Sequence, residues 1–585
     1  MSFFSGLRIL GSQQLLCHSA HLLRGSTTIP ALRHTALAFA RSARSGVTAV
    51  RMGIDYKWSL RRDPNDIGEE EYERVKSECH ARNAKRLLKL CETNGGIYLK
   101  LGQHIAAMVY LLPPEYTSTF SVLFDRCPKT PLEDIEGLFR TDLNASLSDF
   151  FASFDPEPLG IASLAQVHRA TLPTGAEVAV KIQHPYLDEY TPVDIATASR
   201  MVEFAKKAFP EFQLEWLAEE MRKSLPQELD FELEALNALK VSANFKGFDT
   251  LHIPVVHWAK RRILVMEYIR GSRTSDLKYL KENNISPYEV SEEMTKAFSE
   301  MIFLHGFVHC DPHPGNILIR AKPAKWRFPL FRLWAKKHNF EIVLLDHGLY
   351  RTLDNSFRLD YARLWNALIA GDEPGIEHYS YRLFTQAERV SEGGIDHHRL
   401  FASMLTGRTW DVISKGSEEL STARSAKEFK SMQNNATSGR FFVAIVDVLA
   451  KLPRELLLLL KTNDLLRAVD DGLGVSTGAT DHMMRMLATM GWYCALAIRR
   501  ETLRILREER KRGLQSGDIL VPMPLWIHAR FWESVVEYWK VGIRLRVLNV
   551  AVGVKRVWNW WFGKGEAEKR LDEMAEALSR GVADM

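Results

Sequence analysis

The 585-residue sequence has no uncharged apolar run of about 18 residues, so it predicts no membrane-spanning helix. Its six cysteines form no C-x-x-C pair, which argues against a disulfide framework or a zinc ribbon. The 77 Lys and Arg residues almost balance 72 Asp and Glu residues, and a net charge of +5 does not by itself indicate nucleic-acid binding. A hydrophobic content of 46% and a charged content of 25% predict a globular protein.

The first 53 residues contain no acidic residue and no lysine, but six arginines and many serines. This composition is typical of a mitochondrial transit peptide, which the membrane potential draws inward. A secretory signal is not favoured, because no continuous apolar core follows a charged start. The alternative is a disordered basic tail. We therefore predict that residues 1–53 are a transit peptide and that the protein is mitochondrial.

Hydrophobic periodicity predicts a sheet domain followed by a helical one. Two helices are expected first, over residues 68–92 and from Ile97 to the Pro113-Pro114 pair, with Gly95-Gly96 between them. Strand-like runs come next, at residues 163–170, 177–182, 262–268 and 341–345. After Asp346 the pattern is helical to the C-terminus, which predicts an α+β fold.

Four polar residues follow the order that phosphoryl transfer requires. Lys181 lies in the strand-like segment AEVAVKIQ (residues 176–183), and its ammonium would orient phosphates. Asp311 and Asn316 stand five apart in HCDPHPGN, the interval of the kinase catalytic loop, whose Asp orients the attacking hydroxyl. Asp346 opens Asp-His-Gly after a strand, where kinases carry Asp-Phe-Gly. Asn316 and Asp346 are thus candidate Mg²⁺ ligands, and Asp311 and Lys181 are candidate catalytic residues.

The histidines of the same segment allow another interpretation. His309, Asp311 and His313 could bind a transition metal, since imidazole and carboxylate suit zinc or iron. Two histidines four apart form a metal pair on a helix, however, and the prolines between them predict a loop.

An ordinary kinase would carry a G-x-G-x-x-G loop before Lys181, and this chain has PLGIASLAQVH at residues 158–168 instead. That segment resembles the alanine-rich loop of the UbiB-like atypical kinases, also called the aarF-domain or ADCK family. NGGIYLKLGQ is similar to their K-x-G-Q signature, QELDFELEALNA to their E-x-D segment, and KTNDLLR to a helical motif near the domain end. The resemblance covers residues 70–480 and points most to the mitochondrial branch that includes fungal relatives.

The resemblance implies a bilobal protein-kinase-like fold with a small sheet lobe, a helical lobe and helical extensions. The domains it implies are an N-terminal helical extension (54–130), an N-lobe (131–270), a C-lobe (271–480) and a C-terminal extension (481–585). It also implies ATP or ADP with Mg²⁺ as cofactors. The nucleotide-binding residues carried over by motif are Lys100, Gln103, Gly160, Ala162, Ser163, Lys181, Glu228, Asp230 and Glu267.

Three features of these motifs bear on mechanism. Gly160 would let the backbone approach a phosphate, whereas Ile161 adds bulk where relatives have alanine. The acid that pairs with Lys181 is left open between Glu220 and Glu228. In the family, the helix face with the K-x-G-Q lysine and glutamine folds over the active site. The resemblance therefore implies ATP hydrolysis or a small or lipidic substrate rather than a protein substrate.

Two basic, aromatic stretches suggest further contacts. Residues 321–340 carry six Lys or Arg, no acid before Glu341 and five Trp or Phe, a pattern that suits an anionic membrane surface. A partner protein or a disordered loop is equally compatible with it. Residues 538–565 are similar and suggest either an interfacial helix or packing onto the fold. No nucleic-acid-binding motif is found.

Two functional hypotheses follow. In the first, the protein is an atypical kinase or ATPase of the inner mitochondrial membrane that acts in lipid or coenzyme Q homeostasis, with a lipid or quinone as a partner. In the second, it is a pseudokinase that binds nucleotide and a lipid or protein partner without phosphoryl transfer. Protein partners are not predicted by the sequence.

Overall fold

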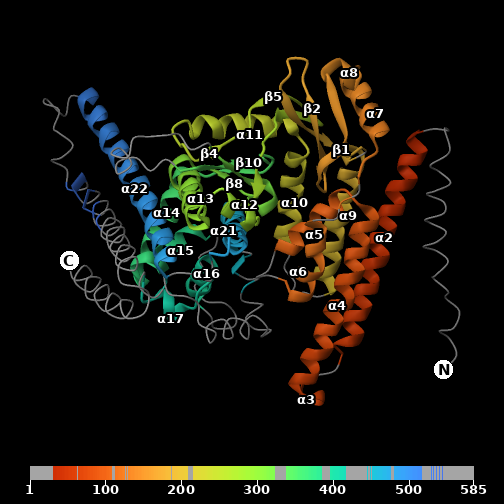
Figure 1. Cartoon of the computed structure of the whole chain (residues 1–585). Helices are drawn as coiled ribbons and strands as arrows, with labels where there is room; N and C mark the ends of the chain where they lie inside the picture. The colour runs from red at the N-terminus through yellow and green to blue at the C-terminus, as the bar shows by residue number, and fades with distance from the viewer. Residues whose placement is uncertain are drawn as a thin grey trace. The chain divides into compact units, whose positions relative to one another are not determined.

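The computed structural model divides the chain into two compact units. Unit 1 comprises Met1–Leu236 and Val255–Tyr268, and unit 2 comprises Asn237–Pro254 and Ile269–Met585. Figure 1 traces the elements along the chain. The described residues are 30–61, 64–107, 112–124, 127, 129–185, 187–208, 215–322, 338–384, 396–416, 420, 445, 448–449, 451–475, 480–516, 529, 531–532, 535–536, 539 and 543.

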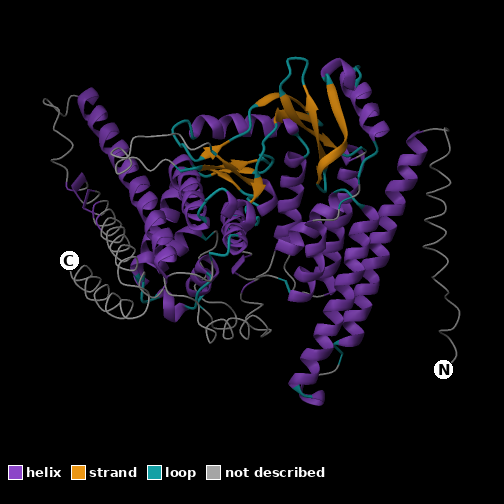
Figure 2. Cartoon of the chain, in the orientation of Figure 1, coloured by secondary structure: helices purple, strands orange, loops and turns teal. Residues whose placement is uncertain are grey.

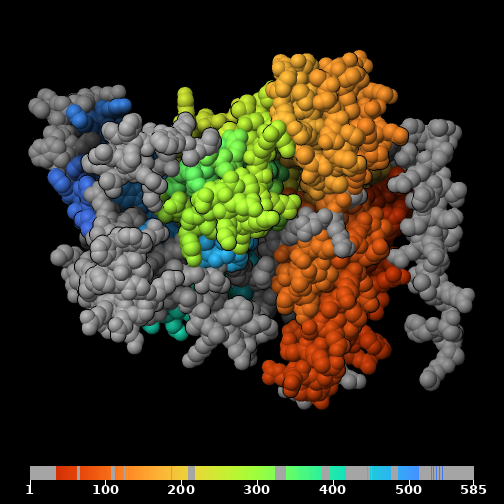
Figure 3. Space-filling view, viewed as in Figure 1, coloured from red at the N-terminus to blue at the C-terminus, as the bar shows by residue number. Residues whose placement is uncertain are grey.

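Unit 1 begins with packed helices whose atoms form one continuous mass in the space-filling view (Figure 3). They are α2 (Pro30–Ser59), α3 (Pro64–Ile67), α4 (Glu69–Asn94), α5 (Ile97–Ala107), α6 (Pro114–Phe120) and the 3₁₀ turn η1 (Ser121–Phe124). The two predicted helices are confirmed as α4 and α5, while residues 108–111 lie outside the described residues. Gly95 ends α4 with a φ of 64°, a value that residues with a side chain disfavour.

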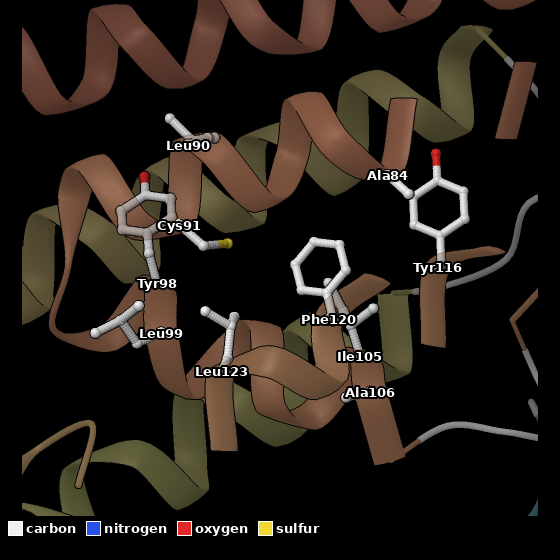
Figure 4. Close-up of a cluster of buried hydrophobic side chains, with 10 residues drawn as sticks. All are labelled: Ala84, Leu90, Cys91, Tyr98, Leu99, Ile105, Ala106, Tyr116, Phe120 and Leu123. Atoms are coloured by element: carbon white, nitrogen blue, oxygen red, sulfur yellow. The ribbon is translucent and has the colours of Figure 1, made fainter. Parts of the chain in front are cut away.

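The core of these helices explains the glycine of the K-x-G-Q motif. Figure 4 shows the buried side chains, which are Ala84, Leu90, Cys91, Tyr98, Leu99, Ile105, Ala106, Tyr116, Phe120 and Leu123. A Cβ atom on Gly102 would collide with Leu123 and Phe120. Glycine is therefore required here because α5 packs closely against α6 and η1.

Helix α2 is held to the rest of unit 1 by buried polar contacts. The Arg41 guanidinium forms a bidentate pair with Asp194 of α9 (Leu187–Ala208), with Nε to Oδ1 at 2.9 Å. Arg41 is 14% exposed and Asp194 3%. The buried Ser45 hydroxyl shares a 2.7 Å hydrogen bond with the Tyr98 hydroxyl. Residues 30–53 of the predicted transit peptide thus lie in a packed helix of this unit.

Unit 1 continues with an antiparallel five-stranded sheet (orange strands in Figure 2). In spatial order its strands are β1 (Ser153–Ile161), β2 (Ala165–Thr171), β3 (Glu177–Gln183), β6 (Ile263–Glu267) and β5 (Val256–Lys260). The predicted strands before residue 270 are confirmed as β2, β3 and β6, to within two residues at each end. Strands β1 and β5 were not predicted.

Strand alternation places Lys181 on a particular face of this sheet. Val178, Val180 and Ile182 of β3 are buried beneath α7 (Leu132–Leu143) and α8 (Leu147–Phe150). Successive side chains of a strand point to opposite faces, so Ala179 and Lys181 face the other way. On that face lies the start of α11 (Phe231–Asn244), which follows α10 (Glu215–Glu228).

Unit 2 contains two small sheets and many helices. One sheet has the order β4 (Leu251–His252), β10 (Phe340–Leu344), β9 (Ile317–Ala321), β7 (Ser272–Arg273), and the other pairs β11 (Tyr350–Thr352) with β8 (Phe307–His309). Its helical elements are α12 (Leu277–Glu282), α13 (Pro287–Ser299), η2 (Glu300–His305), η3 (Pro314–Asn316), α14 (Asn355–Ala370), α15 (Glu373–Leu383), α16 (His397–Thr406), α17 (Trp410–Ile413), α21 (Arg454–Gly472) and α22 (Thr480–Ser516). The predicted strand over 341–345 is β10, and the predicted α+β class is confirmed.

The basic, aromatic stretch at residues 321–340, which we call the insert, is anchored to α13 near its C-terminal end through His338. Glu293 accepts hydrogen bonds from Thr250 at 2.6 Å and Lys296 at 2.7 Å, and it pairs with His338 Nε2 at 3.4 Å. Burial raises the pKa of Glu293, but these contacts outweigh burial and lower the pKa to about 2. Residues 323–337 of the insert lie outside the described residues.

Candidate functional site

Lys181 is held by a buried carboxylate in unit 1. Its Nζ donates to both carboxylate oxygens of Glu234, at 2.8 and 2.9 Å. Glu234 is 1% exposed and lies in the first turns of α11. This corrects the expectation that Glu220 or Glu228 pairs with Lys181, because the facing helix is α11 rather than α10. The ammonium also lies 5.0 Å from the Phe231 ring centroid.

The K-x-G-Q motif contacts both the E-x-D segment and the alanine-rich loop within unit 1. Lys100 pairs with Glu228 at 2.8 Å, and both side chains are at most 15% exposed. Gln103 Oε1 accepts a hydrogen bond from Ser163 at 3.1 Å, and Gln103 Nε2 donates to the Leu123 carbonyl at 2.9 Å. Four of the predicted nucleotide-binding residues are thus joined in two pairs.

The loop between β1 and β2 is a tight turn closed by its own backbone. The Ala162 N–H donates to the Ala165 carbonyl at 2.7 Å, and the Ala162 carbonyl is hydrogen-bonded to the His184 ring at 2.9 Å. At Gly160 a Cβ atom would meet nothing within 4 Å. Packing within the protein therefore does not require glycine at this position, and the space beside the Gly160 backbone is open.

Asp230 and Glu267 have local structural contacts. Asp230 Oδ1 accepts the N–H groups of Glu232 and Leu233 at 3.0 and 3.2 Å, which caps the start of α11. Glu267 is the last residue of β6, and its carboxylate accepts the Val255 N–H at 3.2 Å. These contacts fix the positions of the two carboxylates.

In unit 2 the predicted catalytic loop is confirmed as a loop between β8 and η3. The Asp311 carbonyl accepts the His313 N–H at 2.7 Å and the Asn316 side-chain amide at 3.3 Å. The Asp311 carboxylate accepts a hydrogen bond from Lys461 of α21 at 2.8 Å. The loop therefore folds on itself and brings Asp311 and Asn316 together.

A hairpin brings Asp346 beside Asn316. Strands β9 and β10 are antiparallel, with Ile317 opposite Leu344. The Leu345 N–H donates to the Asn316 carbonyl at 2.9 Å, and Asp346 follows at once. Asp346 Oδ1 accepts the Gly348 N–H at 2.9 Å, which orients the carboxylate.

The histidines of these loops serve the fold. The Nδ1 atoms of His309 and His313 accept backbone N–H groups two residues onward, at 3.2 and 3.1 Å. His309 is fully buried, and burial lowers its pKa although Asp311 and Asp346 act to raise it. His347 is buried and hydrogen-bonded to the Tyr350 hydroxyl and the Leu344 carbonyl. These roles do not support the transition-metal interpretation.

The donors of Asn316 and Asp346 suit a magnesium ion. Both residues offer oxygen atoms, and Mg²⁺ is commonly bound by one or two carboxylates together with substrate phosphates and water. No group of three or more His, Cys, Asp or Glu residues arranged for a metal occurs among the described residues. A site with two protein ligands that is completed by phosphates is compatible with both observations.

Two residues of the site were missed by the sequence analysis. Glu234 is 53 positions from Lys181, and Lys461 is 150 positions from Asp311. Both lie inside segments that carry a motif resemblance, the E-x-D segment and KTNDLLR, but spacing alone does not say which residue of a helix faces the site. The start of a helix at Phe231, with Asp230 as its cap, is the signal that could have indicated Glu234.

Comparisons with known proteins cover most of the chain. A sequence profile described as the ABC1 atypical kinase-like domain matches residues 122–380. AarF domain-containing protein kinase 1 of Xenopus tropicalis is 40% identical over 528 residues, which span 89% of this chain and 92% of the relative. The ABC1 family protein MCP2 homolog of Schizosaccharomyces pombe is 39% identical over 508 residues, covering 86% and 84%. The Rv3197–erythromycin complex from Mycobacterium tuberculosis covers 69% of this chain and 100% of its own at 19% identity, with a TM-score of 0.38.

Proposed function

The chain belongs to the ABC1 (AarF) atypical kinase-like family, as its sequence predicts, and on that premise we propose that it is a mitochondrial Mg-ATP-dependent kinase or ATPase. The observation that supports the proposal is that the polar residues predicted for phosphoryl transfer each have defined contacts within their own unit. Lys181 is paired with a buried glutamate, and Asp311, Asn316 and Asp346 come from one folded loop and the hairpin that adjoins it.

Each residue has a defined role in this proposal. Lys181 orients the phosphates of ATP or ADP, with Glu234 fixing its ammonium. Asn316 and Asp346 would hold Mg²⁺, which neutralises charge on the phosphates when it is bound. Asp311 orients the nucleophile and accepts its proton. In hydrolysis, the water oxygen bonds to the γ-phosphorus, the bridging bond breaks with its electron pair leaving on ADP, and the water proton passes to Asp311.

A small or lipidic acceptor, in lipid or coenzyme Q homeostasis, is the substrate class we propose. The support is that Lys100 and Gln103 of α5 bind the E-x-D glutamate and the alanine-rich loop. Motifs that would contact phosphates are thereby covered by a helix of the same unit, which disfavours a folded protein as acceptor. The same contacts favour a second candidate function, a nucleotide-dependent switch in which α5 moves and no phosphate is transferred.

We further propose that the protein associates with the inner mitochondrial membrane at an anionic surface. The apolar residues Ile54 and Trp58 of α2 are 63% and 67% exposed. They continue an exposed stripe at helical spacing, which also contains Phe39, Val47 and Val50. Exposed Arg51, Lys57 and Arg61 flank the stripe, and Arg61 stacks on Trp58 at 4.2 Å. Basic residues beside an apolar helix face that carries tryptophan suit an anionic interface.

Two other observations bear on this membrane proposal. No helix among the described residues is long and apolar enough to cross a bilayer, so the proposal is for surface contact. Near the C-terminus the described positions Trp532, Val536, Trp539 and Ile543 are 43–53% exposed and repeat with helical spacing. Most of the predicted 538–565 stretch lies outside the described residues.

The experiment that tests the enzymatic proposal is nucleotide binding and hydrolysis by the purified chain, with and without Mg²⁺. Asp346→Asn should lose the Mg²⁺-dependent part of binding and lower turnover by at least about 100-fold, as removal of a catalytic electrostatic group typically does. The matched control is Asp354→Asn, an exposed carboxylate of unit 2 with no side-chain capping bond. Identical nucleotide binding by Asp346→Asn and wild type would refute the site. Mg²⁺-dependent binding without hydrolysis would favour the switch.

The membrane proposal is tested by flotation with vesicles. Vesicles that contain cardiolipin should bind the wild-type chain, whereas neutral vesicles should not. The double variant Ile54→Glu/Trp58→Glu should bind at least several-fold less, because it places charge on the apolar stripe. Leu159→Glu is the control, since Leu159 is 49% exposed and lies on β1 rather than on α2. Equal binding of the wild type, the double variant and the control to cardiolipin vesicles would refute the proposal.

A further inference from the structure

The predicted catalytic loop contains no cation of its own. Between Asp311 and Asn316 the residues are Pro312, His313, Pro314 and Gly315. The His313 ring is engaged by the Gly315 N–H. A transferring phosphoryl group nevertheless carries negative charge on its equatorial oxygens, and enzymes place positive charge beside it.

Lys461 brings a positive charge to this loop from 150 residues further along the chain. Its Nζ lies 2.8 Å from Asp311 Oδ1. The two side chains are 18% and 19% exposed, so the pair is neither sealed in the core nor fully solvated. An ion pair at that depth is oriented by the protein and still accessible to a small ligand.

Two neighbours of Lys461 on α21 hold the helix against other elements. Asn463 donates to the Tyr361 hydroxyl of α14 at 3.4 Å, and Arg467 donates to the Leu405 carbonyl of α16. The KTNDLLR segment therefore fixes α21 through these two side chains and presents Lys461 to Asp311.

We propose that Lys461 is a positioning residue for phosphoryl transfer, which orients the Asp311 carboxylate and supplies the cation that the catalytic loop lacks. This inference rests on the proposed function and deepens it. In the transfer step described above, Asp311 must accept a proton from the nucleophile along one direction. The ammonium holds one carboxylate oxygen and thereby fixes the orientation of the carboxylate, and its charge offsets the charge that develops on the phosphoryl oxygens.

Two other roles of the Lys461–Asp311 pair make different predictions. If the pair were a lock that blocks Asp311, removal of Lys461 would raise turnover. If the pair only stabilised the fold, removal would lower the melting temperature and leave the turnover of the folded fraction unchanged. Positioning predicts a fall in kcat with nucleotide affinity preserved.

The test compares Lys461→Met, Lys461→Arg and Lys278→Met in the full chain, by ATP turnover, Mg-nucleotide affinity and thermal melting. Lys278 is 86% exposed on α12 of the same unit and serves as the lysine control. Lys461→Met should lower kcat by about 100-fold or more with the nucleotide Kd within about three-fold of wild type. Lys461→Arg, which keeps the charge and a donor, should recover at least about ten-fold of that loss.

A double variant separates positioning from stability. The losses of kcat from Asp311→Asn and Lys461→Met should be clearly less than additive in the double variant, because part of the effect of the lysine acts through the aspartate. Unchanged or raised kcat in Lys461→Met, or full additivity in the double variant, would overturn the inference. A wild-type chain that binds nucleotide but does not hydrolyse it would instead overturn the proposed enzymatic function, and the inference with it.

Discussion

Replacing Arg41 by methionine should destabilise unit 1 although Arg41 lies inside the predicted transit peptide. Arg41 is the bidentate partner of Asp194, which is 3% exposed. Removing one member of a buried pair leaves an uncompensated charge and costs about 3–5 kcal/mol. For a unit of about 250 residues, 1 kcal/mol corresponds to about 2–4 °C, so the melting temperature should fall by about 6–20 °C. Arg51→Met, at an exposed position of the same helix, should change it by less than about 2 °C.

The assay is thermal melting of the three proteins at pH 8 and at pH 5. Burial already raises the pKa of Asp194, although Arg41 opposes that shift. Without Arg41 the pKa of Asp194 should rise further, so the carboxylate becomes neutral as the pH falls toward 5 and the loss of stability should shrink there. The double variant Arg41→Met/Asp194→Leu should recover part of the stability, because no buried charge remains. Equal melting of Arg41→Met and Arg51→Met would refute the reasoning and leave residues 30–53 free to be removed as a transit peptide.

Three further outcomes are expected. Glu234→Gln should keep the fold but weaken the hold on Lys181, lowering nucleotide affinity by about ten-fold in a titration, and unchanged affinity would count against the pair. Asp230→Ala should cost about 1 kcal/mol in denaturant unfolding, because α11 loses its cap. The pKa of Glu293 is lowered to about 2, so its stabilising contribution is complete above about pH 5 and is lost as the pH falls toward 2. Glu293→Gln should therefore flatten the acid limb of the stability curve, and an unaltered limb would contradict this.

The residues predicted from sequence are those whose geometry is local. The four residues between Asp311 and Asn316, two of them proline, are enough to define a loop that returns on itself. Alternation along β3 is enough to place Lys181 opposite the apolar face. The comparisons confirm the family that these short motifs indicate.

The features that could not be predicted from the sequence depend on partners far along the chain or lie where the alternation of a strand is interrupted. Strand β1 contains Pro156 and Pro158 and has two register irregularities, so it lacks the alternation by which strands are predicted. The pairing of Lys461 with Asp311 depends on the folded chain, which brings α21 to the loop that contains Asp311. Likewise, the composition of the segment around Arg41 predicts an import signal, and only the structure shows that Arg41 pairs with Asp194.

The hairpin of β9 and β10 makes the connection between Asn316 and Asp346 a permissive place for insertion. Its two strands pair from Ile317 and Leu344 at one end to Ala321 and Phe340 at the other. Four residues of antiparallel strand span about 14 Å, so sequence added beyond Ala321 enters the chain well away from the end of the hairpin that adjoins Asn316 and Asp346. The length of this connection can therefore change without changing the distance between the two residues. An engineer could exchange residues 323–337 for an epitope or a fluorescent reporter, and evolution had the same freedom to add a new binding segment there.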